Sequence, residues 1–206
     1  MACSLILAAL ALINFCSGDD FNGTVYRLNL SHVEVTEPID SSGYNLTLQQ
    51  KAENFTLLDS SGKSVPLNIS ETFWGGDHSY ALSFGRNVSG FLIYSYRSPS
   101  PQQFIVPLND QKPVRIVLPP GYTTGDRLLG IANPPPDEVQ VRDDGRVLTW
   151  YNTSGHLMIE VSYYQENAPK MIAKIFLALL VIAGGILLEY YLSIRRLRKV
   201  RMDTER

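Results

Sequence analysis

Cysteine is scarce in this chain, and its scarcity excludes several kinds of site. The 206 residues include two cysteines, Cys3 and Cys16, and both lie close to the N-terminus. The rest of the chain therefore has no disulfide, no thiolate metal site and no cysteine nucleophile. About 150 residues, from 19 to 168, remain before a long apolar run, which is enough to bury a hydrophobic core.

Recognisable catalytic and cofactor-binding motifs are also lacking. The histidines His32, His78 and His156 are isolated in the sequence and form no metal-binding pair. No Gly-x-Ser-x-Gly elbow, glycine-rich phosphate loop or Asp-x-Asp-x-Asp-Gly calcium loop occurs. A hairpin turn accounts for Asp143-Asp144-Gly145. We predict no catalytic residue, no cofactor and no metal ligand, and we expect a protein that is not an enzyme.

One long apolar run lies near the C-terminus. Residues 175–188 carry no charge, and the run extends from Met171 to Ile194 if Lys174 and Glu189 are included. About 20 apolar residues cross a bilayer, so we predict a transmembrane helix over 169–194 rather than a buried core helix. The tail, 195–206, is basic and is predicted to be cytoplasmic. The residues predicted to set this topology or to bind lipid headgroups are Arg195, Arg196, Arg198, Lys199 and Arg201.

The N-terminus resembles a secretory signal. Eleven apolar residues, Leu5 to Phe15, are followed by Cys16-Ser17-Gly18 and two aspartates. We predict a signal peptide over 1–18, cleaved after Gly18, although its first four residues carry no Lys or Arg. Lipidation at Cys16 and an uncleaved anchor remain as alternatives.

Glycosylation signals point to the same topology. The asparagines that begin an Asn-x-Ser/Thr triplet are Asn22, Asn29, Asn45, Asn54, Asn68, Asn87 and Asn152. Ser and Thr make up 28 of 206 residues, so eleven asparagines would give about 1.5 such triplets by chance. All seven lie between the signal and the apolar run, which predicts N-linked glycans on an extracytoplasmic domain.

Charge follows the same division. Residues 19–168 carry 17 acidic and 10 basic side chains, whereas residues 195–206 carry 6 basic and 2 acidic ones. An acidic domain without a basic patch argues against nucleic acid as a partner. We expect membrane lipid and a protein of the envelope or membrane as partners instead.

Between the two apolar segments the hydrophobic period is two. This alternation predicts strands over 25–35, 46–50, 80–84, 91–96, 114–118, 139–141, 147–150 and 157–163. Turns are predicted at 59–62, 85–90 and 143–145. The fold class is mainly β: an antiparallel β-sandwich, Ig-like or similar, plus one C-terminal transmembrane helix. A linker at 97–102 divides it into an N-terminal lobe, 19–98, and a C-terminal sandwich lobe, 99–168, unless the sandwich is continuous.

Two residues are candidates for a partner contact. Trp74 lies on a Gly-Gly loop beside Asp77 and His78, where an exposed indole would stack on a sugar or dock a protein. We prefer the interpretation that Trp74 is buried and the glycines form a turn. Glu189 is ionisable within the predicted span, so it pairs with a partner helix or, as we prefer, reaches the inner headgroups.

The C-terminal half carries a family resemblance. Ile116-Val117-Leu118-Pro119-Pro120-Gly121-Tyr122, Leu128-Leu129-Gly130, Pro136-Asp137-Glu138-Val139, Leu148-Thr149-Trp150 and Val161-Ser162-Tyr163-Tyr164 lead into the apolar helix. Residues 113–206 thereby resemble an uncharacterised archaeal family of membrane-anchored surface proteins, a domain of unknown function. The resemblance implies an archaeal cell envelope and assigns no functional residue.

These observations give two expectations for function. The first is a single-pass type I cell-surface protein whose glycosylated sandwich is a non-enzymatic binding or structural module of the envelope. The second is an accessory subunit of a transporter, secretion or respiratory complex, held through its transmembrane helix.

Overall fold

The structure is a computed structural model, and it describes residues 21–98, 100–108, 112–125 and 129–204. The signal peptide predicted over 1–18, with Cys3 and Cys16, lies outside the described residues. The chain divides into two compact units, one ending at Tyr163 and one beginning at Tyr164. The first unit consists of strands and the second holds one long helix, so the prediction of a mainly β fold with one C-terminal apolar helix is confirmed.

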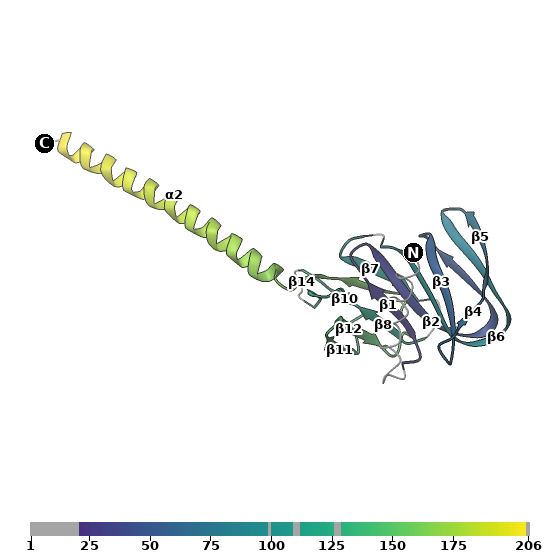
Figure 1. Ribbon diagram of the computed structural model, residues 1–206. Coiled ribbons are helices and arrows are strands. Elements are labelled where there is room, and N and C mark those ends of the chain that lie inside the picture. The colour runs from purple at the N-terminus through teal and green to yellow at the C-terminus, as the bar shows by residue number, and fades with distance from the viewer. Residues whose placement is uncertain (1–20, 99, 109–111, 126–128, 205–206) are drawn as a thin grey trace, which may run out of the picture. The chain divides into compact units, whose positions relative to one another are not determined.

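Nine strands of the first unit form one large sheet (Figure 1). Its main path runs in the order β11-β12-β8-β1-β2-β6-β3-β4, and β5 pairs with β6 beside this path. The strands are β1 (Thr24–Leu28), β2 (His32–Leu48), β3 (Ala52–Asp59), β4 (Ser64–Val65), β5 (Asn68–Trp74), β6 (Asp77–Arg97), β8 (Val114–Val117), β11 (Glu138–Arg142) and β12 (Gly145–Trp150).

One strand pair in this sheet is parallel. β1 pairs with β8 in parallel register, with Tyr26 opposite Ile116, whereas the other pairs of the large sheet are antiparallel. The purely antiparallel arrangement that we expected is therefore corrected at this pair. The large sheet also runs through both predicted lobes, because β1 lies within 19–98 and β8 within 99–168.

Two strands are much longer than predicted. β2 spans 17 residues and β6 spans 21, and they pair along nearly their whole length with a bulge between Ser41 and Gly43. The turn predicted over 85–90 is wrong, because β6 continues through it with Gly85 in a left-handed conformation (φ 69°). The single strand predicted over 25–35 is also wrong, since β1 and β2 are two strands joined by a turn at 29–31.

A three-stranded sheet packs on the large sheet to make the sandwich. It has the order β10-β13-β7, with β7 (Gln103–Pro107), β10 (Ala132–Asn133) and β13 (Met158–Ser162). Phe104 and Val106 of β7 share one buried core cluster with Val33 and Val35 of β2. A short strand, β9 (Tyr122–Thr123), completes the described strands of the first unit.

Both predicted hairpin turns are confirmed. β3 and β4 are joined at 59–62, where Asp59 Oδ1 accepts hydrogen bonds from the backbone N–H groups of Ser61 and Lys63. The Ser61 hydroxyl also donates to Asp59, and these bonds hold the pKa of that carboxyl below its usual value. β11 and β12 are joined by Asp143-Asp144, and Asp144 accepts a hydrogen bond from Arg27 at 3.3 Å.

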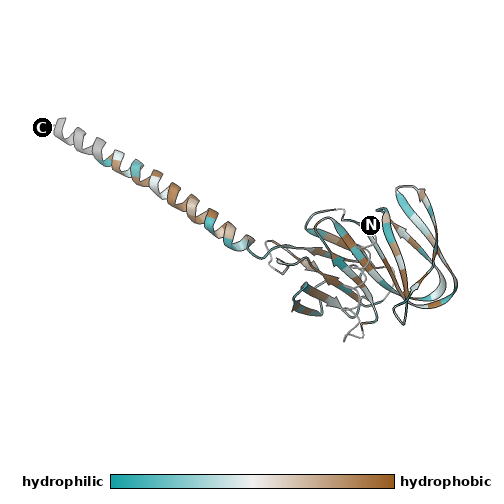
Figure 2. Cartoon of the chain, in the orientation of Figure 1, coloured by the Kyte–Doolittle hydropathy of each residue, from teal (hydrophilic) through white to brown (hydrophobic). Residues whose placement is uncertain are grey.

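The second unit contains β14 (Tyr164–Gln165) and the helix α2 (Ala168–Thr204). Pro169 lies in the first turn of α2, where its missing N–H costs no hydrogen bond. The part from Ala168 to Arg195 is long and apolar enough to cross a membrane, and hydrophobic residues predominate in its middle (Figure 2). The large apolar side chains of this part are exposed. The helix is longer than the predicted 169–194 and continues through the basic segment.

Gly90 lies where the backbones of the paired strands β3 and β6 approach closely, and its substitution tests this fold. A Cβ added at Gly90 of β6 would lie 2.0 Å from the backbone oxygen of Leu58 on β3. Backbone on both sides has to shift, so we expect Gly90→Ala to destabilise the domain by about 2 kcal/mol or more. In thermal unfolding of the full-length protein in detergent, that corresponds to a fall in Tm of about 5 °C or more. The exposed neighbour Arg86→Ala is the control, and equal Tm values for the two variants would contradict this packing.

Candidate functional site

The most distinctive buried feature of the sandwich is a carboxylate on an inward-facing row of β2. Residues 33, 35, 37 and 39 alternate toward the interior, and three of them are the aliphatic Val33, Val35 and Ile39. The fourth is Glu37, whose exposed fraction is only 9%. A buried carboxylate is costly unless it is paired and hydrogen-bonded, so its surroundings have to supply partners.

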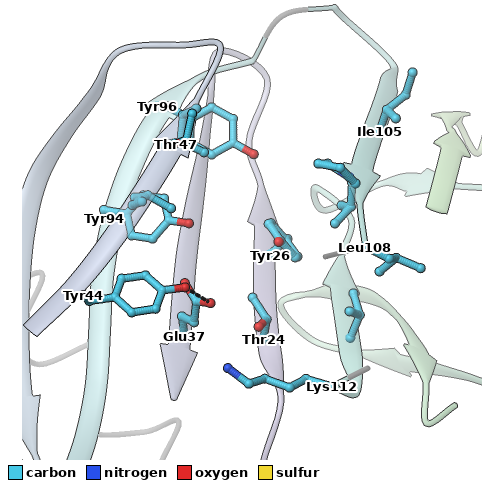
Figure 3. A pocket seen from close by; sticks show the side chains of 15 residues that line it. Thr24, Tyr26, Glu37, Tyr44, Thr47, Tyr94, Tyr96, Ile105, Leu108 and Lys112 are labelled. Atoms are coloured by element: carbon cyan, nitrogen blue, oxygen red, sulfur yellow. Dashed lines mark hydrogen bonds between the residues drawn. The ribbon is translucent and has the colours of Figure 1, made fainter. Parts of the chain in front are cut away.

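Tyr44 is one of these partners, and it comes from the same strand. Its hydroxyl donates a hydrogen bond of 2.6 Å to Glu37 Oε1. The bulge between Ser41 and Gly43 separates the two residues along β2, so the strand changes course between them. Figure 3 shows the Tyr44 ring lying beside Glu37 with its hydroxyl directed at the carboxylate.

Three further tyrosines surround the same space. Tyr94 and Tyr96 of β6 lie opposite Val35 and Val33 of β2, and Tyr26 of β1 lies opposite Val35 on its other side. Figure 3 shows the hydroxyls of Tyr94 and Tyr96 directed into the pocket, with Tyr26 across from them. None of these three hydroxyls has a hydrogen-bond partner among the described residues.

The four tyrosines and Glu37 line a pocket of about 140 Å³. Its other lining side chains are mostly aliphatic, from β7, from the segment that follows it and from the second half of β2: Leu46, Leu48, Ile105, Val106 and Leu108. Lys112 also lines the pocket, and its ammonium group points toward the end that holds Glu37 and Tyr44 (Figure 3). The pocket, which we call the tyrosine pocket, therefore has a polar wall and an aliphatic one.

Burial keeps these phenols protonated. It is the largest cause that raises the pKa of Tyr94 well above its ordinary value, and the nearby Tyr26 and the Glu37 carboxylate add to it. Burial likewise raises the pKa of Tyr26, with smaller contributions from Tyr96 and Glu37, and it raises the pKa of Tyr96. At neutral pH the pocket therefore presents neutral O–H groups that both donate and accept hydrogen bonds.

Residues 76–205, more than half of the chain, match the model of a family described as "Family of unknown function (DUF5803)". The chain belongs to this family. The match confirms the predicted resemblance to a domain of unknown function. No curated protein shows a significant match to the chain.

The family match covers only part of the tyrosine pocket. Tyr94, Tyr96 and Lys112 lie within residues 76–205, whereas Tyr26, Glu37 and Tyr44 precede them. The matched region also contains all of β6, the smaller sheet and α2. The family match therefore includes about half of the residues that line the pocket, and the description of the family assigns the pocket no role.

The pocket was not predicted from the sequence, although one signal for it was present. Glu37 interrupts an otherwise apolar row of alternating residues in β2, and a carboxylate at an inward position is uncommon. Tyr94 and Tyr96 were predicted only as strand residues. Their position beside Glu37 depends on the pairing of β2 with β6, two segments that are far apart in the sequence.

Trp74 corrects one of our interpretations. We preferred a buried indole, but Trp74 is 85% exposed at the end of β5, next to the Gly75-Gly76 turn of the β5–β6 hairpin. Its neighbour Phe73 is also exposed and lies 4.7 Å from the ring of His78. His78 in turn contacts Glu71 through its Nδ1 at 2.9 Å. The glycine turn was predicted correctly, and the indole beside it faces solvent.

The predicted glycosylation sites are all accessible. Each of the seven asparagines is exposed on the first unit, in strands or in turns: Asn22, Asn29, Asn45, Asn54, Asn68, Asn87 and Asn152. Asn54 and Asn87 contact Ser95 and Asp40 through their side-chain nitrogens, on the surface. Accessibility is a requirement for attaching a glycan, and every site meets it.

The other predicted residues lie on α2. Glu189 is exposed on the apolar part of the helix, one turn after Gly185. The Arg195 guanidinium lies 5.2 Å from the Tyr191 ring centre. The side chains of Arg196, Arg198, Lys199 and Arg201 lie outside the described residues. In the described part of the chain, no group of three or more His, Asp or Glu side chains is placed to hold a metal.

The raised pKa values of the tyrosine pocket predict how stability depends on pH. Above about pH 10 the unfolded chain releases phenolic protons that the folded state retains. The contribution of these protonated tyrosines to the free energy of unfolding is therefore fully present below about pH 10. It falls as the pH rises further, by up to about 1.4 kcal/mol per pH unit for each such tyrosine. We expect Tyr94→Phe to reduce this slope in urea unfolding of the full-length protein between pH 8 and pH 11, with Tyr164→Phe as the control. Identical slopes for wild type and Tyr94→Phe would contradict the burial of this tyrosine.

Proposed function

We propose that this protein is a single-pass, membrane-anchored binding module of the cell surface, with its sandwich outside the cell and its basic C-terminus in the cytoplasm. The sandwich carries N-linked glycans, has no enzymatic activity, and uses the tyrosine pocket to hold a ligand or partner of the envelope. The archaeal envelope implied by the family resemblance is part of the same proposal.

The single observation that carries the proposal is the polar wall of the tyrosine pocket. Three neutral phenol hydroxyls line it without a hydrogen-bond partner among the described residues, next to a buried carboxylate. Pairing Glu37 with Tyr44 offsets the cost of its burial, but it does not account for three more polar groups around the same space. A site that binds hydrogen-bonding groups does account for them.

The helix and the surface of the sandwich support the membrane topology. From Ala168 to Arg195 the helix exposes large apolar side chains on every side, which water does not tolerate and a bilayer does. The basic residues that follow favour a cytoplasmic C-terminus. The seven exposed Asn-x-Ser/Thr sites fit an opposite, glycosylated side for the sandwich.

One observation favours the alternative of an accessory subunit. Glu189 and Gly185 are four residues apart on α2, so they lie on the same helix face. A small residue permits close approach of a second helix, and a carboxylate in the membrane favours a partner cation. In this alternative, a larger membrane complex holds the protein through that face.

Cross-linking in native membranes separates the two functions. We expect mass spectrometry to identify glycopeptides at the Asn-x-Ser/Thr sites and cross-links from sandwich lysines such as Lys63 and Lys112 to envelope components. Replacing residues 168–195 by an unrelated span should leave these cross-links unchanged, because the sandwich makes the contact. Loss of the partner with this replacement, and with Glu189→Gln but not Glu166→Gln, would instead establish the accessory subunit.

A further inference from the structure

The chemistry of the tyrosine pocket narrows the class of ligand that it accepts. The inference rests on the proposed binding function and assigns a ligand to the same pocket. Charge is the first constraint. The Glu37 carboxylate is buried in the wall and repels an anion, and Lys112 already brings a positive charge to the same end. Glu37 would repel an anion and Lys112 would repel a cation, whereas a ligand without net charge is repelled by neither side chain.

The orientation of the aromatic rings argues against an organic cation. A cation is bound by the faces of aromatic rings, at which the π electrons lie. In this pocket Tyr44, Tyr94 and Tyr96 instead direct their hydroxyls inward (Figure 3). Tyr94 and Tyr96 stack against each other, with ring centres 6.4 Å apart, so these faces are partly covered.

The hydroxyls also argue against a purely apolar ligand. A polar group that loses water without gaining a partner costs about 1–3 kcal/mol. An apolar molecule in the pocket would impose this cost at Tyr26, Tyr94 and Tyr96 together. A ligand that carries several hydroxyl groups returns a hydrogen bond to each of them, as donor or as acceptor.

The aliphatic wall and the volume of the tyrosine pocket restrict the ligand further. Leu46, Leu48 and Leu108 also line the pocket and offer C–H groups beside the hydroxyls, so the ligand has a polar edge and an apolar face. The volume of about 140 Å³ is close to that of cavities of ~150 Å³ that hold one six-membered ring. We propose that the tyrosine pocket binds a single sugar residue without charge.

The test uses the full-length protein in a detergent that has no sugar headgroup, because alkyl glycosides would compete. Neutral sugars and their methyl glycosides (glucose, galactose, mannose and N-acetylglucosamine) are compared with glucuronate, glucosamine and tetramethylammonium by saturation-transfer NMR. We expect at least one neutral sugar to bind more tightly than its charged relatives. Binding of the methyl glycoside indicates the end of a glycan chain as the natural source, and its rejection indicates a free sugar.

Tyrosine variants locate the binding. Tyr94→Phe and Tyr96→Phe each remove one hydroxyl and keep the ring, so each should weaken binding about tenfold, the effect of one hydrogen bond of about 1.4 kcal/mol. Tyr151→Phe removes a surface hydroxyl outside the pocket and should leave the affinity unchanged.

Three outcomes would overturn the assignment: no neutral sugar binds at tens of millimolar, tetramethylammonium or glucuronate binds more tightly, or neither pocket variant changes the affinity. Failure of the sugar assignment is distinguishable from failure of the proposed binding function. If no sugar binds, yet Tyr94→Phe abolishes the cross-links found for the wild type in native membranes, the pocket still binds a partner and only its sugar chemistry is wrong.

Discussion

The pairing of Glu37 with Tyr44 is the interaction on which the arrangement of the tyrosine pocket depends. A carboxylate on the inward row of β2 is stable only if the fold brings hydrogen-bond donors to it. Tyr44 provides the bond of 2.6 Å, and the bulge in β2 separates these two residues of the same strand. The long ribbon of β2 and β6 then places Tyr94 and Tyr96 beside the pair. The pocket is thus a consequence of how one bent ribbon accommodates one buried charge.

The two sides of the pocket come from different parts of the fold. The polar wall belongs to β1, β2 and β6 of the large sheet, whereas most of the aliphatic wall belongs to β7 and the residues after it. Packing of the smaller sheet on the large one therefore closes the pocket and forms the core in the same step. Any ligand in the pocket would contact both layers, which couples binding to the stability of the sandwich.

Local patterns predicted much of this fold. The alternation in 157–163 and 114–118 and the turn residues at 59–62 and 143–145 specify strands and hairpins from neighbouring residues alone. The apolar helix follows from composition in the same way. The predicted turn over 85–90 failed because glycine and asparagine also occur where a long strand bends, as Gly85 does in β6. The parallel pairing of β1 with β8 and the tyrosine pocket both depend on residues distant in sequence, which period and turn chemistry do not connect.

Our central claim is that the buried Glu37–Tyr44 pair serves binding and is not needed for the stability of the fold. Replacing both partners of a hydrogen bond by apolar groups of similar shape is nearly neutral or stabilising. The decisive measurement compares the unfolding free energy and the cross-linked partners of the wild type with those of the double variant Glu37→Leu, Tyr44→Phe. Our account predicts equal or higher stability together with loss of the partner. A loss of several kcal/mol in stability, with the partner retained, would show that the pair is structural and would contradict the account.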